Sequence, residues 1–256
     1  MPTLNLEPVV AAAVFVGARI AGVMVFAPFL SSDSIAVLVK AGFTVVLTAL
    51  LYPVVGVVGL QADAVGWVRV VIGEFVIGLV LGGTLQFMFD AVEGAGQIVG
   101  VQTGYSLITI LDPATQADTP VLSIFHQLVA LLIFLELDVH HWVLRGLAAS
   151  FAYLPPGAEL SSRALSAGLW HAAAAIWLVA LEMAAPVVAA TLVADVALGF
   201  LGKASPQLPV VFVGLSVKNI LGLLVLAGSL ALWPRLLERH FSWALGLSQR
   251  WLHLAH

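Results

Sequence analysis

Residues 67–89 decide the class of fold, and their sequence is WVRVVIGEFVIGLVLGGTLQFMF. Within this run only Arg69 and Glu74 are charged. A hydrocarbon core about 30 Å thick is crossed by about 20 apolar residues in a helix. The segment is therefore long enough and apolar enough to predict a transmembrane helix, and the surroundings of Glu74 need an explanation.

The composition of the whole chain supports the same conclusion. Hydrophobic residues make up 61% of the 256 residues and charged residues only 9%, whereas a soluble globular chain carries about 25% charged residues. The net charge of −4 gives no basic surface for nucleic acid. The absence of cysteine excludes disulfides, thiol catalysis and cysteine-based metal sites.

Further apolar runs lie on both sides of this segment. They cover residues 9–30, 35–51, 121–137, 142–151, 169–201 and 210–233. The second run is expected to end before Pro53, because proline lacks a backbone donor. The tail, 234–256, mixes basic with apolar residues and predicts an amphipathic helix at the membrane surface. We therefore expect an all-α integral membrane protein with about six to eight hydrophobic helices.

The clearest break in the chain is the segment 155–162, which begins Pro155-Pro156-Gly157. We expect one integral membrane unit, 1–256, made of two parts, 1–160 and 161–256. Residues 1–8 lack the basic region of a cleaved signal peptide, so the first apolar run is expected to be retained. Three of the ten Lys and Arg residues lie in the tail, which predicts a cytoplasmic C-terminus.

Four charged residues lie well within apolar runs: Arg19, Glu74, Glu182 and Lys218. A charge at the bilayer centre costs about 2.5–3.5 kcal/mol on insertion scales. These side chains are therefore expected to face protein or water. Structural pairing between helices or subunits is the favoured explanation, and a proton or ion relay is the alternative.

Glycines recur at every fourth position in two places, first at Gly78 and Gly82 and then at Gly96, Gly100 and Gly104. On a helix, such spacing forms a flat stripe that another backbone can approach closely. The longer stripe is accompanied by Glu93, Gln97 and Gln102, which makes it too polar for lipid. Its backbone is expected to be buried in protein or to line an aqueous cavity.

The loop 111–120 contains Asp112-Pro113 and Thr119-Pro120, which both resist continuation of a helix. A surface loop and a loop that enters a pore would both satisfy this composition.

The chain has no pattern typical of an enzyme. It contains neither a Gly-x-Ser-x-Gly nucleophile motif nor a phosphate-binding P-loop. His140 and His141 are adjacent, so on a helix they point about 100° apart. They are therefore not expected to share a metal ion, and a role at an interface is favoured. The sequence predicts no enzymatic activity, no cofactor and no metal.

The order of these features resembles the FliR/SctT family of the flagellar and virulence type III export gate. The most specific match is residues 95–104 followed by Asp112-Pro113. The other matches are Arg19, Met24, Pro28, Glu74, Gly78, Gly82, Pro120, Phe125, Phe134, His140, His141, Ser150, Phe151, Pro155, Gly157, Pro206, Gln207, Phe212 and Lys218. The resemblance covers residues 9–233, and the region 96–113 favours the flagellar branch.

The C-terminal region departs from the family pattern at three points. The family usually has an arginine just before its Pro-Gln pair, whereas here Lys203 is the nearest base. Pro209 stands where the family has an asparagine, and Ser216-Val217-Lys218 replaces a Pro-x-Lys pattern.

The resemblance implies a non-enzymatic subunit of a closed conduit for unfolded export substrates. Its expected partners are FliP-like, FliQ-like and FlhB-like subunits, in the bacterial inner membrane at the flagellar basal body. The N-terminal part is expected to be FliP-like, and the C-terminal part a FliQ-like helical hairpin. Glu74, Lys203 and Lys218 are expected to pair with charges on other chains.

The resemblance also suggests residues for the pore and for packing. The pore or plug candidates are Gln102, Gly104, Leu111, Asp112, Pro113, Thr115, Gln116, Asp118 and Pro120. The candidates for helix and subunit packing are Gly78, Gly82, Gly96, Gly100, Gly104, Pro206 and Gln207.

A self-contained secondary transporter or ion channel is the alternative function. Secondary transporters usually show inverted repeats and broken helices near the membrane midplane. Pro186 and Gly222 are only weak signs of such breaks.

Overall fold

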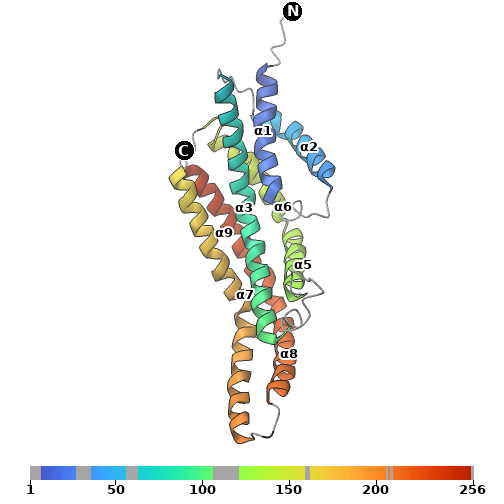
Figure 1. Ribbon diagram of the computed structural model, residues 1–256. Helices are drawn as coiled ribbons and strands as arrows, with labels where there is room; N and C mark the ends of the chain where they lie inside the picture. The colour runs from blue at the N-terminus through green and yellow to red at the C-terminus, as the bar shows by residue number, and fades with distance from the viewer. Residues whose placement is uncertain are drawn as a thin grey trace, which may run out of the picture. The chain divides into compact units, whose positions relative to one another are not determined.

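The computed structural model describes residues 7–26, 36–55, 63–105, 121–158, 162–205, 207 and 210–254 (Figure 1). Its helices are α1 (Glu7–Phe26), α2 (Val37–Val55), α3 (Ala64–Thr103), α5 (Val121–Glu136), α6 (Val139–Tyr153), α7 (Ser162–Ala204), α8 (Val210–Ser229) and α9 (Trp233–Leu254), with a 3-10 turn η2 (Leu230–Leu232) before α9. These described ranges contain no strand. The predicted all-α fold class is therefore confirmed.

Several of these helices are long and apolar enough to cross a membrane. The segments that meet this criterion are Val9–Phe26, Ala64–Thr103, Trp170–Ala204 and Phe212–Leu247. Helices α5 and α6 together could provide a fifth span. Length and composition thus agree with the prediction of an integral membrane protein.

Two helices continue through a proline. The second apolar run was expected to end before Pro53, but α2 extends to Val55. Pro53 lies close to the end of α2, so its missing N–H removes only one hydrogen bond of the last turn. Helix α7 likewise contains Pro186, whose ring leaves the carbonyl of Glu182 without its usual helical donor.

Helix α3 is longer than its most apolar part. It continues beyond residue 89 through the polar stretch and ends at Thr103. Gly104 follows with φ 86°, and its N–H donates to the carbonyl of Val101 at 3.2 Å. Glycine adopts this left-handed conformation without a Cβ penalty, which makes it a common helix terminator.

The helices gather into two compact units. The first contains Met1–Phe87, Asp138–Ala173 and Phe241–His256, and the second contains Met88–Leu137 and Ala174–His240. Both units therefore draw on segments that are distant in sequence. The predicted parts 1–160 and 161–256 were defined by their expected FliP-like and FliQ-like folds, whereas the two units are defined by which residues contact one another. The predicted division therefore stays a prediction.

Apolar side chains form the core of the first unit. Its buried cluster contains Val16, Ile20, Val23, Met24, Leu47, Ile77, Leu81, Leu147, Phe151 and Leu154. These residues belong to α1, α2, α3, α6 and the turn that follows α6. The core therefore holds together four helices and the break predicted near residue 155.

In the second unit, α3 packs closely on α5. The rings of Phe89 and Phe134 meet edge to face with centroids 5.7 Å apart. Further along α5, the ring of His126 lies 4.8 Å from that of Trp233 at the start of α9.

Helix α9 is amphipathic, as predicted, but its apolar side is buried in the protein. Trp233, Leu237, Phe241 and Ala244 recur at helical spacing and are almost fully buried. These apolar side chains of α9, which were expected to lie on the membrane surface, therefore pack against other residues of the chain.

Candidate functional site

Two charged side chains of the first unit, Arg19 and Glu74, are almost fully buried and form an ion pair. Arg19 Nη2 lies 2.6 Å from Glu74 Oε2, and the two side chains are 0% and 2% exposed. Arg19 Nε donates to the same oxygen at 2.7 Å. One carboxylate oxygen thus lies against two nitrogens of the same guanidinium and accepts a charge-assisted hydrogen bond from Nε.

The remaining donors of Arg19 reach α6 and the turn after it. Nη1 donates to Ser150 Oγ at 2.9 Å and Nη2 to the carbonyl of Leu154 at 2.9 Å. The guanidinium carbon lies 4.0 Å from the ring centroid of Phe151. A buried guanidinium loses its hydration, so these contacts replace the water that it would otherwise bind.

Glu74 has a second partner in the turn after α6. The N–H of Gly157 donates to Glu74 Oε1 at 3.2 Å, and Gly157 has φ 90°, which favours glycine. The cluster of Arg19, Glu74, Ser150, Leu154 and Gly157, which we call the arginine cluster, joins α1, α3, α6 and the following turn.

This geometry supports one explanation of the charges, structural pairing, for Arg19 and Glu74. Pairing between helices is confirmed for Arg19 and Glu74, because each satisfies the other inside the chain. The expectation that Glu74 pairs with a charge on another subunit is wrong. That expectation failed because 55 residues separate the two partners, and hydrophobic periodicity carries no information about which helices meet.

Close contact between α1 and α3 makes the arginine cluster possible. A Cβ added to Gly78 would lie 2.0 Å from the carbonyl oxygen of Arg19, and one added to Gly22 would lie 2.2 Å from the carbonyl oxygen of Phe75. One turn later, a Cβ on Gly82 would lie 2.7 Å from the carbonyl oxygen of Val23. The first glycine stripe therefore serves a crossing of two helices within this chain.

Gly96 has the same role in the second unit. A Cβ at this position would lie 2.5 Å from Ser123 Cα on α5. Ser123 Oγ also donates to the carbonyl of Glu93 at 3.2 Å, which uses an acceptor on the polar stretch of α3. Gly96 and Gly100 are both buried, so part of the predicted stripe is enclosed by protein.

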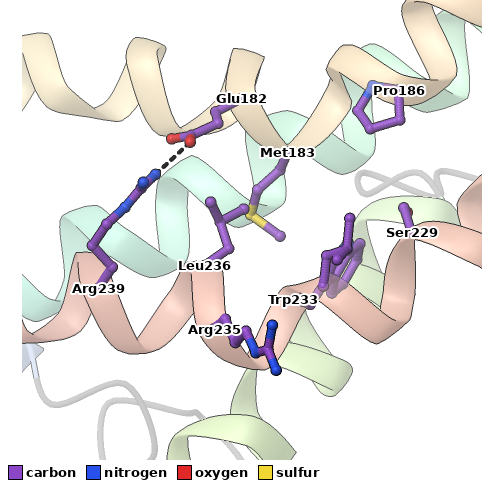
Figure 2. A pocket seen from close by; sticks show the side chains of 9 residues that line it. Glu182, Met183, Pro186, Ser229, Trp233, Arg235, Leu236 and Arg239 are labelled. Atoms are coloured by element: carbon purple, nitrogen blue, oxygen red, sulfur yellow. Dashed lines mark hydrogen bonds and ion pairs between the residues drawn. The ribbon is translucent and has the colours of Figure 1, made fainter.

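A second charged group lies between α7 and α9 (Figure 2). Glu182 Oε1 accepts a hydrogen bond from Arg239, and Glu182 Oε2 lies 2.9 Å from His240 Nε2. The side chains of Glu182 and Arg239 are 38% and 63% exposed. This pair therefore lies partly at the surface of the chain, unlike the arginine cluster.

The Glu182–Arg239 pair borders a groove of about 280 Å³. Its lining consists of Glu182, Met183, Pro186, Ser229, Leu232, Trp233, Arg235, Leu236 and Arg239. Figure 2 shows the arginine reaching across from α9 to the carboxylate on α7. The groove is mainly apolar, and its charged lining residues are Glu182, Arg235 and Arg239.

Lys218 on α8 pairs with Asp195 on α7. Its Nζ lies 2.9 Å from Asp195 Oδ2, and the two side chains are 20% and 44% exposed. Lys218 therefore has a partner within the chain, and the expectation that it also pairs with a charge on another chain stays a prediction. Lys203, by contrast, is exposed in the last turn of α7. A positive charge at this position is stabilised by the negative end of the helix dipole.

Most of the predicted plug lies outside the described residues. This holds for Leu111, Asp112, Pro113, Thr115, Gln116, Asp118 and Pro120, and also for Pro206. Of the remaining candidates, Gln102 and Gly104 are half-buried and Gln207 is exposed.

The surface of several helices is strongly apolar. On α2, Val37 and Leu38 are highly exposed, and on α7 the same is true of Trp177 and Phe200. Phe212 continues this pattern on α8. Apolar patches of this kind indicate contact with lipid or with protein partners.

His140 and His141 also differ from expectation. Their ring centroids lie 4.1 Å apart, although the residues are adjacent on α6. The two residues were expected to point about 100° apart and not to share a metal ion. Such an angle between neighbouring Cα–Cβ directions still leaves enough reach for two long side chains to converge.

Reasoning from the sequence missed most partners of the charged residues. Asp195, Arg239 and His240 were not among the candidates, and no local pattern marks them. Ser150 and Gly157 did occur among the residues that match the family, so the resemblance contained a signal for the arginine cluster.

Comparison with known proteins adds independent evidence. Residues 10–244 match the family described as "Bacterial export proteins, family 1". The flagellar biosynthetic protein FliR of Escherichia coli (strain K12) is 33% identical over 225 residues, which cover 88% of this chain and 86% of that protein. FliR of Bacillus subtilis (strain 168) is 33% identical over 156 residues, 60% of each chain. The secretion system apparatus protein SsaT of Salmonella typhimurium is 28% identical over 211 residues, 78% of this chain and 79% of that protein.

Proposed function

The chain belongs to the bacterial export proteins of family 1, the FliR/SctT family, and we propose that it is a subunit of a flagellar type III protein export gate. The family match along 10–244 is the observation that carries this proposal. The higher identity to a flagellar protein, 33% against 28% for the secretion system protein, supports the flagellar branch.

In this gate the chain contributes part of a closed conduit for unfolded export substrates. It works with FliP-like, FliQ-like and FlhB-like subunits and carries out no chemistry of its own. The exposed apolar side chains support such an assembly. Trp177 and Phe200, for example, are each 70% exposed on α7, and large aromatic side chains are typical anchors of protein interfaces.

The gate lies in the bacterial inner membrane at the flagellar basal body, with the C-terminus of this chain in the cytoplasm. The apolar spans support the membrane location. The arginines of α9 support the orientation, because cytoplasmic segments carry an excess of basic residues.

The C-terminal part, 161–256, corresponds to a FliQ-like helical hairpin and the N-terminal part, 1–160, to a FliP-like fold. A short connection between α7 and α8 supports the hairpin. The Lys218–Asp195 pair, which joins the two helices, also supports it.

The segment from Gly104 to Pro120 narrows or plugs the conduit. The dipeptides Asp112-Pro113 and Thr119-Pro120, which resist continuation of a helix, support this role. The position of the segment in the sequence directly after α3 also supports it. The C-terminal end of α7 contacts neighbouring subunits through Lys203, Pro206 and Gln207.

Purification of the full chain from native membranes in mild detergent tests the assembly. We expect a stable hetero-oligomer that contains FliP-like and FliQ-like subunits. A purified monomer that moves protons or a small solute across vesicle membranes would instead support a secondary transporter.

Removal of Thr115 to Asp118 tests the plug. We expect increased ion leak across the membrane while the complex remains assembled. Replacement of the same residues by an equally long Gly-Ser segment is the control, because it separates loop length from side-chain identity. An intact complex with unchanged leak in the deletion variant would contradict the plug.

A further inference from the structure

Three potential metal ligands converge at the start of α6. The carboxylate oxygen Oδ1 of Asp138 lies 3.1 Å from Nδ1 of His141 and 3.8 Å from Nε2 of His140. One ligand atom from each of the three residues can be chosen so that all lie within 4.8 Å of one another. This group, which we call the Asp-His-His cluster, does not overlap with the candidates for the pore, for packing or for the intramembrane charges.

The backbone at the start of α6 explains the convergence. Asp138 has φ 53°, a left-handed conformation that aspartate tolerates better than most residues. Its carbonyl accepts hydrogen bonds from the N–H groups of His141 at 2.9 Å and Trp142 at 3.4 Å. Val139 is fully buried and anchors this turn, while Asp138 and His141 remain exposed.

Helix capping does not account for the position of the carboxylate. An aspartate at an N-cap usually accepts a hydrogen bond from a backbone N–H of the first turn. Within the described part of the chain, Asp138 makes no such side-chain cap bond. Its carboxylate approaches the two imidazoles instead, and their ring centroids lie 4.1 Å apart.

The distances suit a small metal ion. Zinc binds imidazole nitrogen and carboxylate oxygen at about 2.0–2.2 Å, which places neighbouring ligands of a tetrahedron about 3.3 Å apart. The separations of 3.1 and 3.8 Å lie on either side of this value. Imidazole is a suitable ligand for zinc, copper and nickel ions. The carboxylate adds a negatively charged oxygen ligand, which attracts any divalent cation.

We propose that Asp138, His140 and His141 form a binding site for a divalent transition-metal ion of the Zn²⁺ class. The site is open, so water or a group from another molecule completes the coordination. A bound ion links the N-cap residue of α6 to the first turn and thereby stabilises the start of this helix. This inference goes beyond the proposed export function, which requires no metal.

Zinc titration of the purified full chain tests the proposal. The chain should carry an affinity tag without histidine and be titrated with Zn²⁺ in detergent by calorimetry. We expect saturable binding that Asp138→Asn, His140→Ala and His141→Ala each weaken by at least about 10- to 100-fold, because loss of a residue that only orients a metal ligand already costs this much. Asparagine also tolerates the left-handed conformation, so Asp138→Asn removes the charge without disturbing the turn.

His171→Ala is the matched control, because His171 is an exposed histidine on α7 outside the cluster. It should bind Zn²⁺ as tightly as the unaltered chain. The proposal is overturned if the unaltered chain binds no Zn²⁺, or if the three cluster variants keep its affinity.

A measurement on the unaltered chain covers the case in which a variant does not fold. Histidines can be modified with diethyl pyrocarbonate with and without Zn²⁺ and the products located by mass spectrometry. Protection of His140 and His141, with His171 modified equally in both samples, supports the site. Equal modification of His140 and His141 with and without Zn²⁺ overturns it.

Discussion

The intramembrane ion pairs of the first unit and of the second differ in how far the chain itself buries them. The side chains of Arg19 and Glu74 are at most 2% exposed, and four segments complete their hydrogen bonds. In the second unit, Lys218 and Glu182 have partners in the chain but remain partly exposed.

This difference teaches that intramembrane charges can have two roles within one chain. A fully enclosed pair can hold helices together without any other subunit. A partly exposed pair has capacity for further contacts, because its side chains still present surface to a neighbouring molecule. The first kind is expected to control folding, and the second to control assembly.

The largest effect is expected from breaking the arginine cluster. Glu74→Ala leaves Arg19 buried without its counter-ion, and loss of one partner of a buried pair costs about 3–5 kcal/mol. The free energy of unfolding in detergent should fall accordingly, as measured by chemical denaturation of the purified chain.

The double variant Arg19→Met/Glu74→Leu is the control for this prediction. Replacement of both charges by apolar residues is often neutral or stabilising in a buried pair, so much of the lost stability should return. If Glu74→Ala unfolds with unchanged free energy, the cluster does not hold the first unit together.

The next largest effect is expected at the crossing of α1 and α3. Gly78→Ala places a Cβ 2.0 Å from a backbone carbonyl, and such overpacking costs about 1–3 kcal/mol or more. Gly73→Ala on the same helix meets nothing within 4 Å and should gain a few tenths to about 1 kcal/mol, because alanine favours helix over glycine. Thermal unfolding of both variants measures the difference, and equal melting temperatures would argue against close backbone packing.

A smaller effect on folding is expected from the pairs of the second unit. Lys218→Ala should change the free energy of unfolding by about 0–1 kcal/mol, as for other solvent-accessible ion pairs. A double-mutant cycle with Asp195→Ala isolates the interaction energy. A coupling as large as that expected for Arg19 and Glu74 would remove the distinction between the two units.

The smallest effect on the isolated chain is expected at its exposed aromatic residues. Trp177→Ala should leave the free energy of unfolding within about 0.5 kcal/mol, yet reduce recovery of the hetero-oligomer from membranes. His171→Ala provides a comparison on the same helix, because His171 is exposed and is not assigned to a subunit contact. If Trp177→Ala assembles normally, that face of α7 meets lipid rather than protein.

Much of the fold could be predicted from local sequence. The runs of apolar residues predicted the helices, since burial of backbone groups in lipid requires helical hydrogen bonding. The exceptions are instructive. Pro53 and Pro186 lie inside helices, because packing outweighs the loss of one hydrogen bond at each position.

The candidate sites could be predicted only in part. The sequence singled out Arg19, Glu74 and the glycines at 78 and 82 as positions that needed an explanation. It did not predict that they meet one another, because a charge or a glycine specifies what kind of neighbour it needs and not which one. The convergence of His140 and His141 likewise depended on the left-handed turn at Asp138.

The sequence by itself thus determined an all-helical membrane protein and its family, because hydrophobic length and motif order are properties of the chain alone. Tertiary structure decided which charges are satisfied internally. Gly22 and Gly78 allow α1 and α3 to approach, and only then can Arg19 reach Glu74. Such a contact depends on backbones brought together across 55 residues of chain, which no local pattern encodes.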